Sequence, residues 1–287
     1  MRFLSFRHRG KESYGAVVEG AVIDLGARLG REAATLAALL GGGSLDSALE
    51  LAAKTTADLA LADIEYLPPI PRPGKIICIG VNYGKRHEEY GDDSHASRYP
   101  SVFMRTPESL VGHEQPILRP PESEQLDYEG EIALVIGRPG RRISADAAWD
   151  HVAGLSLLNE GTVRDWLRHA KFNVTQGKNF AASGSFGPWL VTRDEIRNRE
   201  TLHLTTRVNG ELRQDDTPAN LIFGFDYLIS YLSTFMPLSS GDVIATGTPT
   251  GAGARFDPPK YLRAGDVVEV SVPELGTLRN RVQDERP

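Results

Sequence analysis

Short apolar runs, separated by glycine, proline and charged residues, dominate the chain from about residue 75 onward. Short runs rich in branched side chains are typical of β-strands. We predict strands at residues 75–79, 101–105, 115–118, 130–137, 152–159, 187–192, 203–208, 242–245, 266–272 and 277–282. Helical spacing is rarer, and we predict helices at 161–170, 194–199 and 219–235. Many strands and few helices, without regular alternation, predict an α+β, mainly β fold.

The first 70 residues predict a small N-terminal α+β domain. Residues 14–24 alternate around Glu19-Gly20, which is typical of a hairpin turn. Two segments rich in alanine and leucine follow, and both are predicted helices. Prolines crowd residues 68–73, and because proline fixes φ and lacks an N–H, we predict an extended connector there. The predicted division is 1–70 for the small domain and 71–287 for the main domain.

The segment 219–235 is apolar at nearly every angular position of a helix. Thr217 and Pro218 offer an N-cap and a first-turn proline, so the predicted helix opens there. A helix that is apolar all round is buried or lies in a subunit interface. Tyr227 and Tyr231 are four residues apart and are expected to share one face.

Composition narrows the classes of protein to consider. A net charge of −6 and a pI near 5.7 argue against a protein that binds nucleic acid or an anionic membrane. The single cysteine, Cys78, cannot form a disulfide within the chain. No apolar stretch approaches the ~20 residues of a membrane span, and no signal peptide is evident. We therefore expect a cytoplasmic enzyme.

Acidic residues alternate at the start of the predicted strand at 130–137. Because successive side chains of a strand point to opposite faces, Asp127, Glu129 and Glu131 are expected on one face and Ile132, Leu134 and Ile136 on the other. Like charges so close together raise one pKa unless a cation lies between them. Hard oxygen ligands suit Mg²⁺, Mn²⁺ or Ca²⁺. The alternative is a frayed strand end with solvated acids.

Other stretches carry candidate chemistry with open alternatives. Glu160 ends an apolar strand just before a predicted helix. It is either a metal ligand or an acid that interacts with the dipole of that helix. Lys178 follows a glycine and is either aimed at an anion or solvated in a turn. His87 and Glu89 form an acid/base pair or belong to a solvated loop. The loop 246–253 lacks the Gly-Lys-Ser/Thr ending of a phosphate-binding loop, so we predict no nucleotide site.

Taken together and in order, these stretches resemble the fumarylacetoacetate hydrolase family. The matching residues are 79–83, 107–113, 127–131 with their apolar tail, Asn159-Glu160 with Arg164-Asp165, 177–180, 208–211, 241–244 and 246–251. The resemblance implies a mixed β-roll catalytic domain, a small N-terminal domain and a homodimer. It also implies a divalent metal, usually Mg²⁺, held by a Glu-x-Glu pair and a third acid.

The resemblance assigns roles to individual positions. Glu129, Glu131 and Glu160 match the metal ligands, with Glu160 where the family usually has aspartate. Lys178 matches the catalytic lysine, and Thr248 matches a threonine that contacts substrate. Further substrate-binding residues are implied by the stretches that line the family's site, and these are Tyr83, Arg105 and Ser109.

Two departures from the family pattern concern the activation of water. Many hydrolytic members have a histidine four residues after the asparagine that matches Asn82, and a glutamate seven after it. Arg86 occupies that histidine position, His87 comes one residue later, and Glu89 falls at the glutamate position. Leu167 replaces a glutamine of the family. His87 and Glu89 are therefore the candidate catalytic base pair, beside Lys178.

The expected function is that of a metal-dependent enzyme on small 2-oxo or 2,4-dioxo acids, acting through a stabilised enolate. C–C bond hydrolysis is the reaction expected first. The alternative is an isomerase or decarboxylase of unsaturated 2-oxo dicarboxylic acids, or an oxaloacetate decarboxylase. A Ca²⁺-stabilised binding protein is the alternative outside the enzymes. The charged segment 85–93 is expected to act as a lid over the bound substrate.

Overall fold

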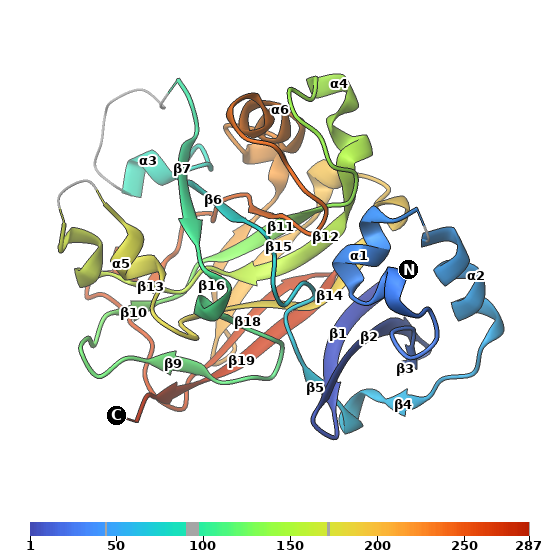
Figure 1. Cartoon of the computed structure of the whole chain (residues 1–287). Helices are drawn as coiled ribbons and strands as arrows, with labels where there is room; N and C mark the ends of the chain where they lie inside the picture. Colours follow the sequence, from blue (N-terminus) through green and yellow to red (C-terminus); the bar gives the residue numbers. More distant parts are fainter. Residues whose placement is uncertain (44, 90–97, 171–172, 287) are drawn as a thin grey trace.

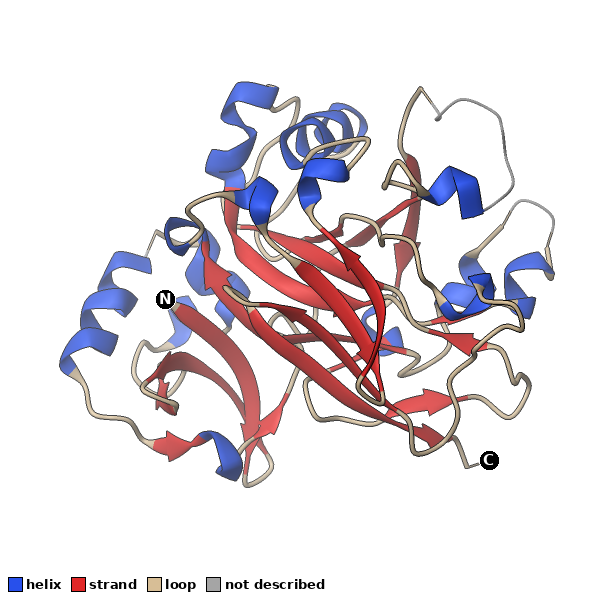
Figure 2. Ribbon diagram, turned by 180° about the vertical axis from the view of Figure 1, so that it is seen from behind, coloured by secondary structure: helices blue, strands red, loops and turns tan. Residues whose placement is uncertain are grey.

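A computed structural model describes residues 1–43, 45–89, 98–170 and 173–286 (Figure 1). Within these ranges, one sheet of 12 strands, one of five and one of two hold most of the regular structure. The six α-helices of the same ranges are short and lie around the strands, as Figure 2 shows from behind. The prediction of an α+β, mainly β fold is confirmed.

The strands are grouped by sheet. The path of the large sheet runs through β4 (Leu59–Ala60), β3 (Ala21–Asp24), β2 (Lys11–Val18), β1 (Arg2–His8), β14 (Gly184–Thr192), β12 (Val152–Asn159), β11 (Gly130–Ile136), β17 (Val243–Ala245), β6 (Ile76–Gly80) and β7 (Ser101–Arg105), with β5 (Glu65–Tyr66) on β1 and β8 (Leu110–Val111) on β14. The five-stranded sheet contains β16 (Glu211–Asp216), β15 (Leu204–Val208), β18 (Val267–Val272), β19 (Gly276–Asp284) and β9 (Ile117–Arg119), and the pair is β10 (Leu126–Asp127) with β13 (Thr162–Val163). The α-helices are α1 (Leu36–Gly41), α2 (Leu45–Lys54), α3 (Arg86–Glu89), α4 (Ala145–Ala148), α5 (Thr175–Lys178) and α6 (Phe225–Phe235).

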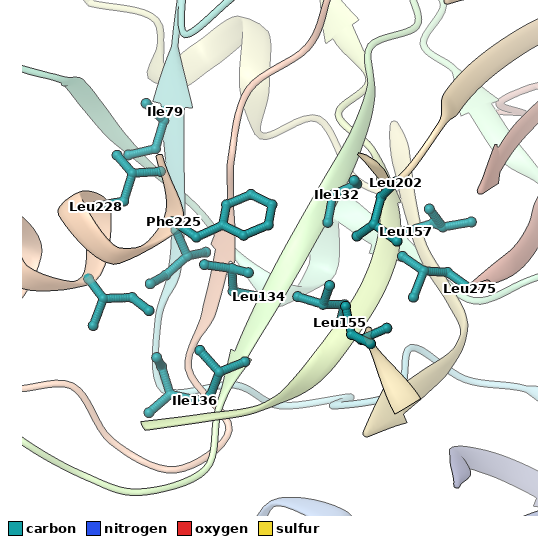
Figure 3. Close-up of a cluster of buried hydrophobic side chains, with 14 of the residues drawn as sticks. Ile79, Ile132, Leu134, Ile136, Leu155, Leu157, Leu202, Phe225, Leu228 and Leu275 are labelled. Atoms are coloured by element: carbon teal, nitrogen blue, oxygen red, sulfur yellow. The ribbon is translucent and has the colours of Figure 1, made fainter. Parts of the chain in front are cut away.

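Strand β11 lies at the centre of the large sheet and is buried at every position. As the alternation predicted, Ile132, Leu134 and Ile136 share one face, and they belong to one buried cluster with Phe225 and Leu228 of α6 (Figure 3). The other face, with Ala133 and Val135, belongs to a second cluster that includes residues of the N-terminal segment. Apolar side chains on both faces make β11 a rigid support for whatever its first residues carry.

The N-terminal segment continues the large sheet. Its predicted hairpin is confirmed, with Val18 paired to Ala21 across Glu19-Gly20, and α1 and α2 occupy the two alanine- and leucine-rich segments. Strand β1 pairs with β14, so the first residues extend the sheet that holds β11. The division at residue 70 stays a prediction.

The predicted helix at 219–235 is wrong in its first third. Residues 218–220 form a 3₁₀ turn, and α6 begins only at Phe225. Asn82 is the physical reason, because its carbonyl accepts from the N–H of Ile222 at 2.7 Å and its Oδ1 from that of Phe223 at 2.9 Å. These two N–H groups are therefore unavailable to a helix that starts at residue 219.

Helix α6 is buried on one face only. Phe225 is buried, but Tyr227 is 40% exposed and Phe235 is 54% exposed. The prediction that the chain itself buries every side of this helix is therefore wrong. Tyr227 and Tyr231 do share a face, with ring centroids 6.0 Å apart. A subunit interface at this face, and the homodimer as a whole, stay predictions.

Two further helix predictions are wrong. Residues 161–170 contain β13 and a 3₁₀ turn at Asp165–Arg168, because residues 162 and 163 pair with β10. Residues 194–199 lie across two 3₁₀ turns, Arg193–Glu195 and Arg199–Thr201. In the described part of the chain no helix combines the length and the apolar character that a membrane crossing requires.

Candidate active site

Three buried glutamates converge where the central strands of the large sheet end. Glu131 lies in β11, Glu129 precedes that strand, and Glu160 follows β12. The antiparallel register pairs Gly130 with Asn159, and the N–H of Glu160 donates to the carbonyl of Glu129 at 2.7 Å. One carboxylate oxygen of each glutamate lies within 4.8 Å of those of the other two. The pairing of β11 with β12 thus gathers acids that are far apart in the sequence.

Asp127, which the alternation predicts on the same face, does not join this cluster. The strand is interrupted between Asp127, the last residue of β10, and Gly130, the first of β11. The Asp127 carboxylate accepts hydrogen bonds from Arg164 Nε at 2.7 Å and from the N–H groups of Gly253 and Ala254 at 2.8 and 3.0 Å. The prediction fails here because the chain passes from one sheet to another at this point.

The buried carboxylates differ in their electrostatic surroundings. Burial would raise the pKa of Glu129, but the neighbouring cations, Arg164 foremost, outweigh it and hold that pKa below its usual range. Burial raises the pKa of Glu131 well above its usual range, and the charges of Glu160 and Glu129 add to this. The expected repulsion between neighbouring acids therefore acts on Glu131.

The donor set fits a hard divalent cation. Glu129, Glu131 and Glu160 are 4%, 1% and 2% exposed. The Oε1 atom of Glu160 is buried and accepts no hydrogen bond from the residues that the structure describes. A buried carboxylate oxygen without a donor is costly unless a cation is its partner. Carboxylate oxygens suit Mg²⁺, Mn²⁺ and Ca²⁺, so the cluster can hold a divalent metal, and the choice of Mg²⁺ stays a prediction.

Lys178 is buried beside these acids rather than solvated in a turn. Its Nζ contacts Oε2 of Glu129 and lies 3.0 Å from Oε2 of Glu160. Burial would lower the pKa of Lys178, but the two carboxylates outweigh it and raise that pKa. The preceding Gly177 makes the approach possible, because a Cβ there would lie 2.6 Å from the carbonyl of Val163.

A cavity of about 590 Å³ opens beside the glutamates. Its walls come from α3, β7 and α5, which lie on one side of the molecule (Figure 1), and from the ends of β6 and β11. The charged lining residues are Arg86, Arg105, Glu129, Glu131, Glu160, Arg164 and Lys178. Apolar side chains such as Phe103 and Leu167 complete the wall. The cavity is thus lined by both charged and apolar side chains, as sites for small organic acids are.

The residues predicted to bind substrate divide into two groups. Thr248 and Arg105 line the cavity, whereas Tyr83 and Ser109 are buried and are not among the residues that line it. Arg105 donates to the carbonyl of Gly161 at 2.7 Å and, through Nε, to Ser109 Oγ at 3.0 Å. Arg105 and Ser109 therefore brace the backbone next to Glu160, and their substrate contacts stay predictions.

The candidate base Glu89 is engaged at both of its oxygens. Oε2 pairs with Arg86 Nη1, and Oε1 accepts from the N–H of Gly251 at 2.7 Å. Arg86 also reaches Glu129, with Nη2 3.3 Å from Oε1. The side chain of His87 and residues 90–93 of the expected lid lie outside the described residues, so the roles of His87 and of the lid stay predictions.

Two supporting residues escaped the sequence analysis. Arg164 bridges the buried acids, with Nη2 2.8 Å from Glu129 Oε1 and Nε bonded to Asp127. It lies in a stretch that carried the family resemblance, which was the available signal. Gln214 is buried in β16 and donates to Thr248 Oγ1 at 2.8 Å. Its strand is almost entirely polar, so no apolar alternation marked it.

Comparisons with known proteins show which family the chain resembles. Residues 75–283 match the family described as fumarylacetoacetate (FAA) hydrolase, C-terminal. The chain is 43% identical over 226 residues to oxaloacetate tautomerase YisK of Bacillus subtilis (strain 168). The aligned residues are 78% of this chain and 74% of that protein. The crystal structure of a probable 2-hydroxyhepta-2,4-diene-1,7-dioate isomerase from Mycobacterium abscessus is 35% identical, with a TM-score of 0.81 and full coverage of both chains.

A second similar structure was solved with a metal. It is maleylpyruvate hydrolase from Sphingobium sp. SYK-6 in complex with manganese(II) ion and pyruvate, 26% identical, with a TM-score of 0.83 and full coverage of both chains. The relatives are thus named as a tautomerase, an isomerase and a hydrolase. The extent of the family match and the identity to YisK lead to one conclusion: the chain belongs to the fumarylacetoacetate hydrolase family.

Proposed function

We propose that this chain catalyses the keto–enol tautomerisation of a small 2-oxo dicarboxylic acid of the oxaloacetate type, with a divalent metal. Similarity to the Bacillus subtilis oxaloacetate tautomerase supports this reaction over the C–C bond hydrolysis expected first from the sequence. The named relatives are enzymes, which also argues against a protein that only binds Ca²⁺ for stability.

The contacts of Glu89 are the observation that carries the proposal. Hydrolysis needs a base that takes a proton from water. Glu89 is paired with Arg86 and accepts from the N–H of Gly251, and it is not among the residues lining the cavity. A carboxylate held at both oxygens is a poor base for water. Tautomerisation needs no water, because one proton moves between C3 and the 2-oxygen of the substrate.

Lys178 has the central role among the side chains. A divalent metal on Glu129, Glu131 and Glu160 would supply Lewis-acid charge when bound. Lys178 adds a second positive charge, because a lysine is ordinarily protonated at neutral pH and its Nζ lies beside the carboxylates of Glu129 and Glu160. In this proposal the buried ammonium donates a hydrogen bond to the substrate oxygen on which negative charge develops, and a buried charge is more effective there than one in water.

Arg86 and Arg164 orient the acid at the centre of the site. Both guanidinium groups contact Oε1 of Glu129, and Asp127 holds Arg164 from behind. Buried charges paired in this way keep one geometry, because any rotation would leave a charge unpaired. The two arginines are thus proposed to hold Glu129 in position and not to react with the substrate.

The proposal is tested by comparing two reactions of the purified protein with Mn²⁺ or Mg²⁺. Interconversion of the keto and enol forms of oxaloacetate is followed by ultraviolet absorbance, and cleavage of an acylpyruvate by NMR of the products. We expect metal-dependent tautomerisation that EDTA abolishes without unfolding the protein, and cleavage slower by at least about 10²-fold, the scale of one lost acid–base catalyst. Cleavage as fast as tautomerisation, or tautomerisation unaffected by EDTA, would overturn it.

A further inference from the structure

The hydroxyl of Thr248 is held by two protein groups at the wall of the cavity. Gln214 Nε2 donates to Thr248 Oγ1 at 2.8 Å. Thr248 Oγ1 lies 2.9 Å from the carbonyl oxygen of Gly130, which can only accept, so the threonine must donate this bond. Thr248 itself lines the cavity beside the metal-binding acids.

The direction of the first bond is fixed by the backbone around Gln214. Its Oε1 accepts from the N–H of Gly130 at 2.9 Å, and its Nε2 also donates to the carbonyl of Pro249 at 2.9 Å. Turning the amide over would place N–H against N–H and oxygen against oxygen. Gln214 is 1% exposed, so leaving those groups unpaired would carry the full cost of buried unsatisfied polar atoms. Gln214 therefore donates to Thr248 and does not accept from it.

A bulge in β16 aims Gln214 at this point. Thr206 of β15 pairs with Gln214 and Arg207 pairs with Leu212, which leaves Arg213 as an extra residue. The loop after β17 fits closely over the bulge, because Gly251 adopts φ +101° and a Cβ there would lie 1.8 Å from the carbonyl oxygen of Arg213. The extra residue and the glycine together bring the amide under Thr248.

The hydrogen-bonding capacity of Thr248 is then almost used up. A hydroxyl has one hydrogen and two lone pairs. The hydrogen goes to Gly130 and one lone pair to Gln214, so a molecule in the cavity meets only the remaining lone pair. We propose that the carbonyl of Gly130, which takes the only hydrogen, and the amide of Gln214, which can only donate here, together fix Thr248 as a hydrogen-bond acceptor, so that the site selects the enol form of its substrate through the enol hydroxyl. This inference rests on the proposed function.

The consequence is a preference between two acids of the same size. A 2-hydroxy acid offers a hydroxyl hydrogen to Thr248, as an enol does, whereas a 2-oxo acid brings an oxygen that can only accept. One hydrogen bond of ordinary net strength changes affinity by about 3- to 10-fold. The test measures the dissociation constants of lactate and pyruvate by calorimetry, on protein loaded with Mn²⁺.

Four variants separate this role from a merely structural one. Thr248→Val should weaken lactate binding about 3- to 10-fold and leave the dissociation constant of pyruvate unchanged. Thr248→Ser keeps the hydroxyl, so the ratio of the two dissociation constants should match that of wild type. Gln214→Met removes only a donor and leaves the hydrogen of Thr248 on the carbonyl of Gly130, so this variant should still bind lactate more tightly than pyruvate. The control Thr205→Val changes a threonine of the neighbouring strand that does not line the cavity and should change neither constant.

The outcomes are distinct. The proposal would be overturned if the ratio of the lactate and pyruvate dissociation constants were the same in wild type and in Thr248→Val. This comparison holds even if Gln214→Met fails to fold. If Thr248→Val changes the two dissociation constants as predicted but the wild-type protein shows no tautomerisation, the acceptor role of Thr248 is supported and only the proposed reaction is overturned. Failure of the wild-type protein to bind either acid would overturn both.

Discussion

Replacing Glu131 by glutamine should have opposite effects with and without metal. Burial and two neighbouring carboxylates raise the pKa of Glu131 well above the ordinary value of 4.5. A group whose pKa is raised by folding stabilises the protein below its unfolded pKa and loses that contribution as pH rises through the folded pKa. The metal-free wild-type protein therefore loses this contribution to stability from about pH 4.5 upward, whereas Glu131→Gln has no such proton to lose.

The magnitude with metal follows from mass action. A ligand present at 100 times its dissociation constant stabilises the folded protein by about 2.7 kcal/mol, or about 5–11 °C of melting temperature for a chain of this size. Loss of one of three carboxylate ligands should weaken metal binding at least ~100-fold, the upper end of what supporting groups alone contribute. At the same metal concentration the variant then gains only about 0.4 kcal/mol.

The assay is a set of melting curves between pH 5 and 9, with EDTA and with Mn²⁺. We expect the metal-free Glu131→Gln protein to melt above wild type at pH 8 and to converge with it toward pH 5. With Mn²⁺ the order should reverse. Glu122→Gln, a change of an exposed acid, serves as the control and should follow wild type throughout. A variant that melts below wild type in EDTA at pH 8, or binds Mn²⁺ equally well, would refute the reasoning.

Three further variants test the surroundings of the site. Lys178→Met should lower the tautomerisation rate about 10²- to 10³-fold through loss of a buried positive charge, with Mn²⁺ affinity by calorimetry within a few fold; an equal loss of affinity would assign the lysine to metal binding. Gly177→Ala places a Cβ 2.6 Å from the carbonyl of Val163, and overpacking that costs about 1–3 kcal/mol should lower the melting temperature by about 2–12 °C; an unchanged melting curve would contradict the tight packing. Arg86→His should release Glu89 and raise acylpyruvate cleavage by up to about 10²-fold; no increase in cleavage products by NMR would mean that the ion pair is not what suppresses hydrolysis.

The central strands and the acid pair could be predicted because their signals are local. Alternation within residues 130–136 alone determines which side chains of β11 face α6. Glu160 could be located at the end of β12 for the same reason, since an apolar run precedes it. The position of Asp127 could not be predicted in this way, because the groups it contacts, Arg164 and Gly253, come from other parts of the chain.

The start of α6 shows the opposite case, in which a local signal is overridden from a distance. Thr217 and Pro218 are a good helix opening, and the sequence after them favours a helix. The backbone and side chain of Asn82 take the N–H groups of residues 222 and 223, and nothing near residue 220 in the sequence reveals this competition. Gln214 escaped prediction for a similar reason, because its importance comes from the groups it meets across a bulge.

The end of β6 shows how such distant contacts support the site. Val81 has φ +52°, a conformation that is unfavourable for a β-branched residue and that costs about 1–3 kcal/mol. The next residue, Asn82, offsets this cost, because its Nδ2 donates to the carbonyl of Thr246 at 2.8 Å and to that of Phe223 at 3.0 Å. The turn that results leads directly into α3, and so brings Arg86 against Glu129. The same helix carries the ion pair between Arg86 and Glu89, which we propose decides which reaction the metal site supports.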